Sequence, residues 1–114
     1  MAKSPKPYLA YILETLQVIK DNTPADKVAF MADPNAQDAN LMRLQDIGEQ
    51  LSRLRDNFPD FYDRYQAEGW PELIGLRNII SHGYREIDFE TIWLILDEKL
   101  PGISEQIRAV AKEV

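Results

Sequence analysis

Apolar residues recur at helical spacing along almost the whole chain, and this pattern constrains the fold more than any other feature. They form one stripe over residues 7–20 and step by three and four residues over 44–58. The sequence contains no strand-type alternation, no internal repeat and no low-complexity tract. Prolines stand mostly where a stripe begins, as is typical of the first turn of a helix. The pattern therefore predicts an all-α, up-and-down helical bundle with short connections.

Capping residues and prolines predict where each helix begins and ends. The expected helices span about residues 7–20, 24–31, 34–57, 59–69, 71–83, 89–100 and 101–114. The expected N-caps are Thr23, Asp33 and Asp88. Gly69 is the expected end of the fourth helix, and Pro101 is expected to break or kink the helix before the last one. Gly48 lies inside the longest helix, where its expected use is the close approach of another helix.

Length and charge narrow the class of protein. The 114 residues, 45% hydrophobic and 28% charged, suit one globular domain spanning 1–114. A net charge of −6 argues against a general nucleic-acid coat protein, which would carry a basic surface. No apolar run is long enough to span a membrane, and the N-terminus lacks a stretch of signal-peptide type. We therefore expect a soluble, cytoplasmic protein, with residues 1–6 as a flexible arm.

The side chains available for catalysis are few. There is no cysteine and a single histidine, His82, which excludes a thiolate zinc site, a cysteine nucleophile and a multi-histidine metal site within one chain. We expect neither a metal nor a cofactor.

The informative segment is residues 77–85, Arg-Asn-Ile-Ile-Ser-His-Gly-Tyr-Arg. At about 100° per residue, its polar residues gather on one arc and the two isoleucines face the other way. Such an arc can be a solvated helix face. This one, however, holds two arginines, no acid and the only histidine of an acidic protein. Histidine can act as a general base and arginine suits phosphate oxygens, so the pair fits metal-free cleavage of RNA through its 2′-hydroxyl.

The same segment resembles the signature of HepT-like toxins in the HEPN superfamily, in which arginine is followed by four residues, histidine, any residue and tyrosine. Arg77, His82 and Tyr84 meet this signature in full, and Asn78 is the asparagine that typically follows the arginine. The resemblance also includes Asp38-Ala39, Ile47-Gly48-Glu49, Trp70 to Leu76, Ile92-Trp93 and Leu100-Pro101, and so covers about residues 8–107.

The resemblance implies a HEPN-type bundle with short extra helices that forms a homodimer, in which the motifs of two subunits meet across a cleft. It implies a metal-independent endoribonuclease that is the toxin of a toxin–antitoxin pair, with RNA rather than DNA as its substrate. The usual partner is an MntA-like nucleotidyltransferase antitoxin, which transfers AMP to the motif tyrosine, here Tyr84. The alternative is a non-catalytic HEPN binding partner of a nucleotidyltransferase.

By this resemblance Arg77 and His82 are catalytic residues, Asn78 orients the catalytic groups, and Ser81 and Arg85 are candidates for RNA contact. Asn78 and Ser81 could equally be simple helix-surface residues. Arg77 and His82 lie about 140° apart on one ideal helix, which favours a site shared by two copies of the chain.

Other residues have a structural and a functional interpretation. Glu49 is expected in a helix-packing element, with a pair to an arginine near the site as the alternative. Trp70 and Trp93 are expected as core or interface aromatics rather than base-stacking platforms. The arginines of the long helix could line an RNA path, although a solvated face is the expected account of Arg43, Arg53 and Arg55.

Overall fold

The described chain is helical throughout, which confirms the all-α prediction. The computed structural model describes residues 4–82 and 86–114, with residues 79–82 described by their backbone alone, and no strand occurs in these ranges. The helices are α1 Lys6–Asn22, α2 Lys27–Met31, α3 Pro34–Asn57, α4 Pro59–Tyr65, α5 Gly69–His82, α6 Phe89–Leu94 and α7 Leu100–Ala111, with a π-helical turn at Ile95–Lys99. None of these helices is both long and apolar enough to cross a lipid bilayer.

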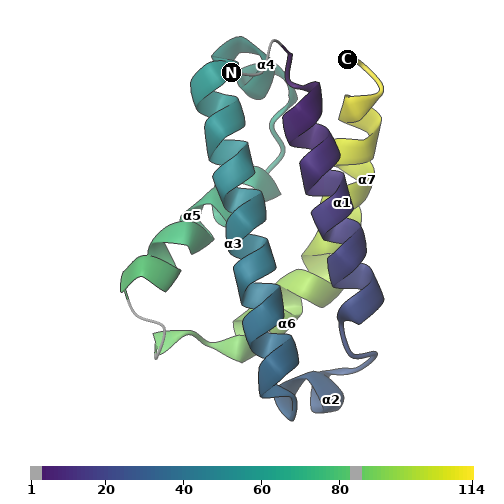
Figure 1. The fold of residues 1–114 in the computed structure, drawn as a ribbon, viewed down its shortest axis with the longest axis vertical. Helices are drawn as coiled ribbons and strands as arrows, with labels where there is room; N and C mark the ends of the chain where they lie inside the picture. The colour runs from purple at the N-terminus through teal and green to yellow at the C-terminus, as the bar shows by residue number, and fades with distance from the viewer. Residues whose placement is uncertain (1–3, 83–85) are drawn as a thin grey trace.

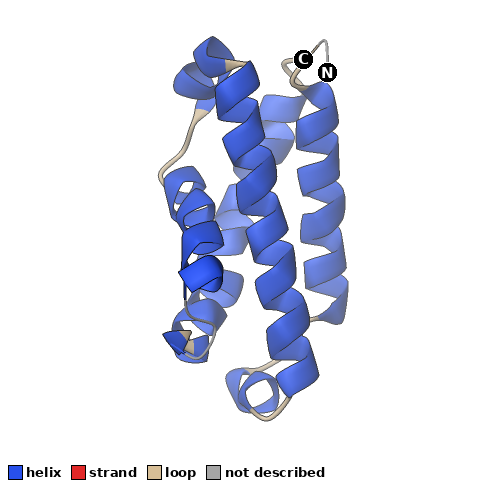
Figure 2. Ribbon diagram, turned by 60° about the vertical axis from the view of Figure 1, so that its left-hand side comes forward, coloured by secondary structure: helices blue, strands red, loops and turns tan. Residues whose placement is uncertain are grey.

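The helices alternate in direction, as in an up-and-down bundle. Figure 1 shows α1 descending, α3 rising, α5 descending obliquely behind α3, and α7 rising beside α1. Figure 2 shows α1 and α3 side by side along the long axis. Helix α3 packs against both α1 and α5, and α7 packs against α1. The short helices α2 and α4 lie at the two ends of α3 (Figure 1).

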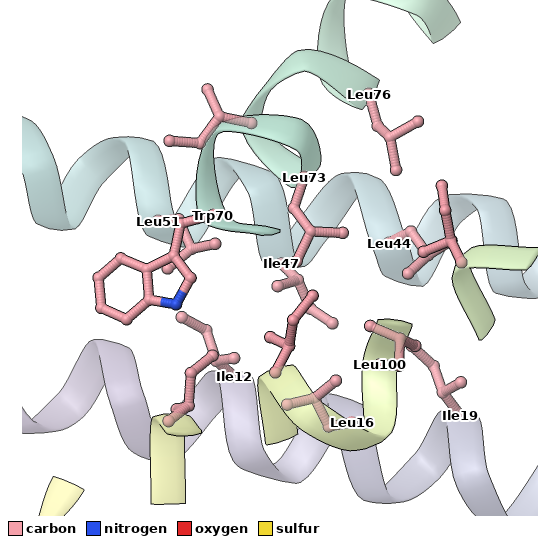
Figure 3. Packing of buried hydrophobic residues seen from close by; sticks show 14 of the residues in the cluster. Ile12, Leu16, Ile19, Leu44, Ile47, Leu51, Trp70, Leu73, Leu76 and Leu100 are labelled. Atoms are coloured by element: carbon pink, nitrogen blue, oxygen red, sulfur yellow. The ribbon is translucent and has the colours of Figure 1, made fainter. Parts of the chain in front are cut away.

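The apolar stripes of the four main helices meet in one core. Figure 3 shows Ile12 and Leu16 of α1 converging with Ile47 of α3 and Leu73 of α5. The fully buried side chains include Leu9, Ile12, Leu44, Ile47, Leu51, Leu54, Trp70, Leu73 and Ile107. The seam predicted on the long helix is therefore the centre of the core. In the last helix Ile103, Ile107 and Val110 are buried as expected. Val114 was expected in the same helix, but it lies beyond the end of α7 at Ala111 and is 41% exposed.

Two of the three predicted N-caps are confirmed and the third is wrong. Asp33 accepts a hydrogen bond from the Ala36 amide at 3.1 Å, and Asp88 accepts one from the Glu90 amide at 3.0 Å. The second helix, however, begins at Lys27 and not at Pro24, because Asp26 is its cap. The Thr23 hydroxyl instead donates to the Ile19 carbonyl at 2.5 Å and so belongs to the end of α1.

The helix boundary predicted at Gly69 is wrong, whereas the one at Pro101 coincides with a change of helix type. Gly69 begins α5 instead of ending α4, which stops at Tyr65. A Cβ atom there would collide with the side chain of Ile103, so this glycine permits close packing of α5 on α7. Near Pro101 the predicted break or kink corresponds to a π-helical turn, Ile95–Lys99, which joins α6 to α7. Pro101 stands in the first turn of α7, where a missing amide hydrogen is tolerated.

Candidate active site

A glycine brings α5 into direct contact with α3 and so places the segment that is predicted to carry the chemistry. A Cβ atom at Gly48 would lie 2.9 Å from the carbonyl carbon of Leu73 and 3.3 Å from the Cα of Ile74. The two backbones therefore touch one turn before Arg77 on α5, and any side chain at residue 48 would separate them. This confirms the close approach predicted for Gly48.

Arg77 reaches from α5 to two side chains of α3. Its Nη1 atom lies 2.8 Å from Oε2 of Glu49 and 3.3 Å from Oγ of Ser52, and it donates to both. The two acceptors are three residues apart and so share one face of α3. The guanidinium of Arg77 is thereby held against that face.

Two more arginines of α3 complete what we call the Arg77 cluster: Arg77, Glu49, Ser52, Arg53 and Arg55. Nε of Arg53 donates to Oε1 of Glu49 at 3.2 Å, and Nη2 of Arg55 lies 3.4 Å from Oγ of Ser52. Each carboxylate oxygen of Glu49 therefore faces a different arginine. Ser52 is only 2% exposed, so its hydroxyl is shielded from competing water.

The contacts of Glu49 keep its side chain ionised. The hydrogen bond from Arg77 is the largest influence and lowers the pKa of Glu49 below its ordinary value; partial desolvation opposes it, and Arg53 acts in the same direction as Arg77. Glu49 is therefore a carboxylate at neutral pH. The Arg77 and Glu49 side chains remain 35% and 33% exposed, so water screens their attraction. Pairs of this kind contribute less than about 1 kcal/mol to stability.

The structure places the other predicted site residues only in part. Helix α5 continues through Ser81 to His82, its last residue, but their side chains lie outside the described part of the chain. Asn78 is exposed. Tyr84 and Arg85 lie outside the described residues altogether. The Arg77 cluster is thus the part of the candidate site for which the structure describes the side chains.

Several predictions made outside the motif can now be compared with the structure. Glu49 pairs with Arg77, the alternative weighed from the sequence, and the helix-packing role falls to Gly48 beside it. Trp70 is fully buried and Trp93 is 9% exposed, so both are core aromatics as expected. Ser52 was not singled out in the sequence, although its three-residue spacing from Glu49 was the available signal.

The arginines of α3 are largely solvated, as expected. Arg53 and Arg55 are exposed and contact acidic or hydroxyl groups of their own helix, while Arg43 is half-buried. Among the side chains that the structure describes, those of residues 4–78 and 86–114, no three acidic residues gather as they would around a metal ion.

The described fold thus defines an all-α protein in which an arginine of one helix is fixed on its neighbour by a carboxylate and a buried hydroxyl. The chain belongs to the ribonuclease HepT-like family, whose model matches residues 12–110. This confirms the resemblance drawn from the motif. No solved structure shows significant similarity to the chain.

Several similar proteins carry ribonuclease names. "Putative RNase MJ1380" of Methanocaldococcus jannaschii is 34% identical over 106 residues, which cover 92% of this chain and 94% of the relative. "Probable ribonuclease HepT" of Thermococcus cleftensis is 27% identical, with 98% of this chain and 100% of the relative covered. "Gamma-glutamylcyclotransferase and putative RNase MJ0434" of M. jannaschii is 30% identical along 100% of this chain, which spans only 50% of that longer protein.

Proposed function

We propose that this chain is a metal-independent endoribonuclease with Arg77 and His82 at its catalytic centre and Asn78 as an orienting group. The observation that carries the proposal is the fixed position of Arg77, the first residue of the motif, in a chain of the ribonuclease HepT-like family. The ribonuclease names of its relatives support the same reaction class.

The reaction needs only groups that the motif supplies. A neutral imidazole of His82 takes the proton of a ribose 2′-hydroxyl, and the 2′-oxygen attacks the adjacent phosphorus. The bond from phosphorus to the 5′-oxygen breaks, and that oxygen leaves as a hydroxyl with a proton from water, to which the imidazolium returns its own. Arg77 stabilises the charge that develops on the phosphate oxygens. The products are an RNA end with a 2′,3′-cyclic phosphate and an end with a 5′-hydroxyl, and DNA is inert because it lacks the 2′-hydroxyl.

Cleavage of RNA by purified variants tests this assignment. We expect His82→Ala and Arg77→Ala to abolish cleavage, wild-type cleavage to persist in EDTA, and the products to end in cyclic phosphate. Full cleavage by the His82→Ala protein would refute the catalytic assignment. Absence of cleavage by the wild-type protein under all conditions would favour the non-catalytic binding partner of a nucleotidyltransferase.

We further propose that the working enzyme is a homodimer whose catalytic pairs form across the two-fold axis. About 140° separates residues 77 and 82 around an ideal helix, which is too wide for one compact site. Subunit mixing provides the test. Equal amounts of Arg77→Ala and His82→Ala protein, unfolded and refolded together, should recover about a quarter of wild-type activity if each site takes its arginine and histidine from different subunits. Recovery of no activity by a verified mixed dimer would contradict the shared site.

The same site suggests how the enzyme is controlled. We propose that it is the toxin of a toxin–antitoxin pair, and that an MntA-like nucleotidyltransferase silences it by transferring AMP to Tyr84. An adenylate next to the motif would add bulk and a negative charge that competes with the RNA phosphate for arginine. Coexpression with the partner should add AMP to the peptide that contains Tyr84, as measured by mass spectrometry. Modification of a Tyr84→Phe protein to the same extent would disprove that target.

A further inference from the structure

The Arg77 cluster places a negative charge directly on the arginine that the proposed reaction requires. Glu49 stands 28 residues before Arg77, on a different helix, yet the two side chains meet at 2.8 Å. A carboxylate in this position partly cancels the attraction of Arg77 for a phosphate. The contact therefore either weakens phosphate binding without benefit or contributes to the reaction in some way other than by charge.

The geometry favours a positioning role. Both acceptors, Oε2 of Glu49 and Oγ of Ser52, are directed at the same nitrogen, Nη1 of Arg77. A planar guanidinium held at one nitrogen by two acceptors from one helix face loses the freedom of a long, rotatable side chain. Its plane is then fixed relative to α3.

The two acceptors are themselves restrained. Arg53 holds the other carboxylate oxygen of Glu49 at 3.2 Å, and Ser52 is almost fully buried. The helix backbones that carry the cluster touch at Gly48 and Leu73, so the distance between them cannot relax without a loss of packing. The support of Arg77 therefore extends from its side chain down to the contact between α3 and α5.

We propose that Glu49, assisted by Ser52, is the positioning residue of the site: it fixes the Arg77 guanidinium in the orientation that receives the scissile phosphate. Neither residue touches the reacting atoms, and both act through Arg77. The inference rests on the proposed catalytic role of Arg77. Glu49 would then act by preorganising the site. In enzymes, a displacement of a catalytic group by about 1 Å can lower the rate about 100-fold.

Glu49→Ala is the decisive variant, and Glu72→Ala is its matched control. Glu72 also accepts an ion-pair contact of 2.8 Å and is exposed on α5, and its partner, Lys99, is not a member of the cluster. Thermal unfolding of both variants checks that any change in activity is not a loss of fold. Cleavage of a labelled RNA is then measured under single-turnover conditions as a function of enzyme concentration, which separates the maximal rate from the apparent affinity.

We expect Glu49→Ala to lower the maximal cleavage rate about 10- to 100-fold while the apparent affinity for RNA stays constant or improves, because a negative charge is removed. Glu49→Gln, whose amide oxygen can still accept from Nη1, should lose less. Glu72→Ala should cleave like the wild-type protein. A wild-type rate for Glu49→Ala overturns the inference, and a faster rate also does so, because it would show that the carboxylate competes with the phosphate.

A second measurement does not depend on activity. In nitrogen-15 NMR spectra of the side chains, the Nη groups of a held arginine rotate slowly and those of a free one rotate fast. We expect the Arg77 signals to be slow in the wild-type protein and fast in Glu49→Ala. Fast signals in the wild-type protein would overturn the positioning role. Full cleavage by Arg77→Ala, in contrast, would overturn the proposed function and leave the contact itself intact.

Discussion

The contact between α3 and α5 leads to a prediction about two glycines that differ only in their surroundings. At Gly48 a Cβ atom would lie 2.9 Å from the Leu73 carbonyl carbon, whereas at Gly75 it would meet nothing within 4 Å. Both residues lie inside helices, so alanine gains about 0.5–1 kcal/mol at each from a less flexible unfolded chain. This gain cancels when the two variants are compared.

The difference between them is the cost of the added methyl group. Overpacking typically costs about 1–3 kcal/mol, and a backbone yields less readily than a flexible side chain. We therefore expect Gly48→Ala to destabilise the fold by about 1–2 kcal/mol and Gly75→Ala to stabilise it by about 0.5–1 kcal/mol. The melting temperature should fall by roughly 4–10 °C in the first variant and rise by a few degrees in the second.

Thermal and urea unfolding followed by circular dichroism measure both variants in parallel. The same displacement should weaken the 2.8 Å contact between Arg77 and Glu49, so RNA cleavage should decrease more than stability alone explains. If Gly48→Ala raises the melting temperature as Gly75→Ala does, then the helices do not touch at this point and the reasoning about the position of Arg77 fails.

Three further predictions concern single contacts. Asp33→Ala removes the cap of α3 and should cost about 1 kcal/mol, whereas Asp33→Asn should cost little, as measured by urea unfolding. Gln106→Leu leaves the buried indole N–H of Trp70, which donates to Gln106 at 2.9 Å, without its acceptor and should cost about 1–3 kcal/mol in the same assay. The lowered pKa of Glu49 means that its stabilisation is complete above its ordinary value of 4.5 and is lost as the pH falls through the lowered one. Glu49→Gln should therefore be less stable than the wild-type protein at pH 7, by a difference that vanishes in acid, and an equal difference at pH 7 and pH 3 would contradict the ion pair.

Local signals in the sequence were sufficient to predict the longest helix. The predicted bounds of α3 agree with the structure at both ends, because Asp33-Pro34 begins the helix and Pro59 follows its end. At the start of the second helix, Thr23 was expected as the cap and Asp26 was not considered. A tertiary contact accounts for the difference, since the Asn40 amide donates to the Thr23 hydroxyl at 3.1 Å while Thr23 lies at the end of α1. The cap of α2 is Asp26, whose side chain accepts a hydrogen bond from the Ala29 amide.

The difference between local signals and tertiary contacts also applies to the candidate site. The motif directed attention to Arg77 because its spacing lies within one helix. The partnership with Glu49 bridges 28 residues and depends on the contact at Gly48, so the sequence could present it only as an alternative. The close contact at Gly69 was missed for the same reason: Ile103, the side chain that a Cβ atom there would meet, belongs to α7.

The acidity of the chain and its proposed substrate are compatible once the Arg77 cluster is considered. A protein with a net charge of −6 gains little from general attraction to the RNA backbone, and Glu49 reduces the attraction at the site further. Binding must then depend on how well a phosphate fits a guanidinium of fixed orientation. Such a site is selective for the geometry in which cleavage occurs, because the ground-state attraction it gives up contributes nothing to the barrier. Reduced attraction for phosphate at Arg77 and restraint of its guanidinium are therefore two consequences of one carboxylate.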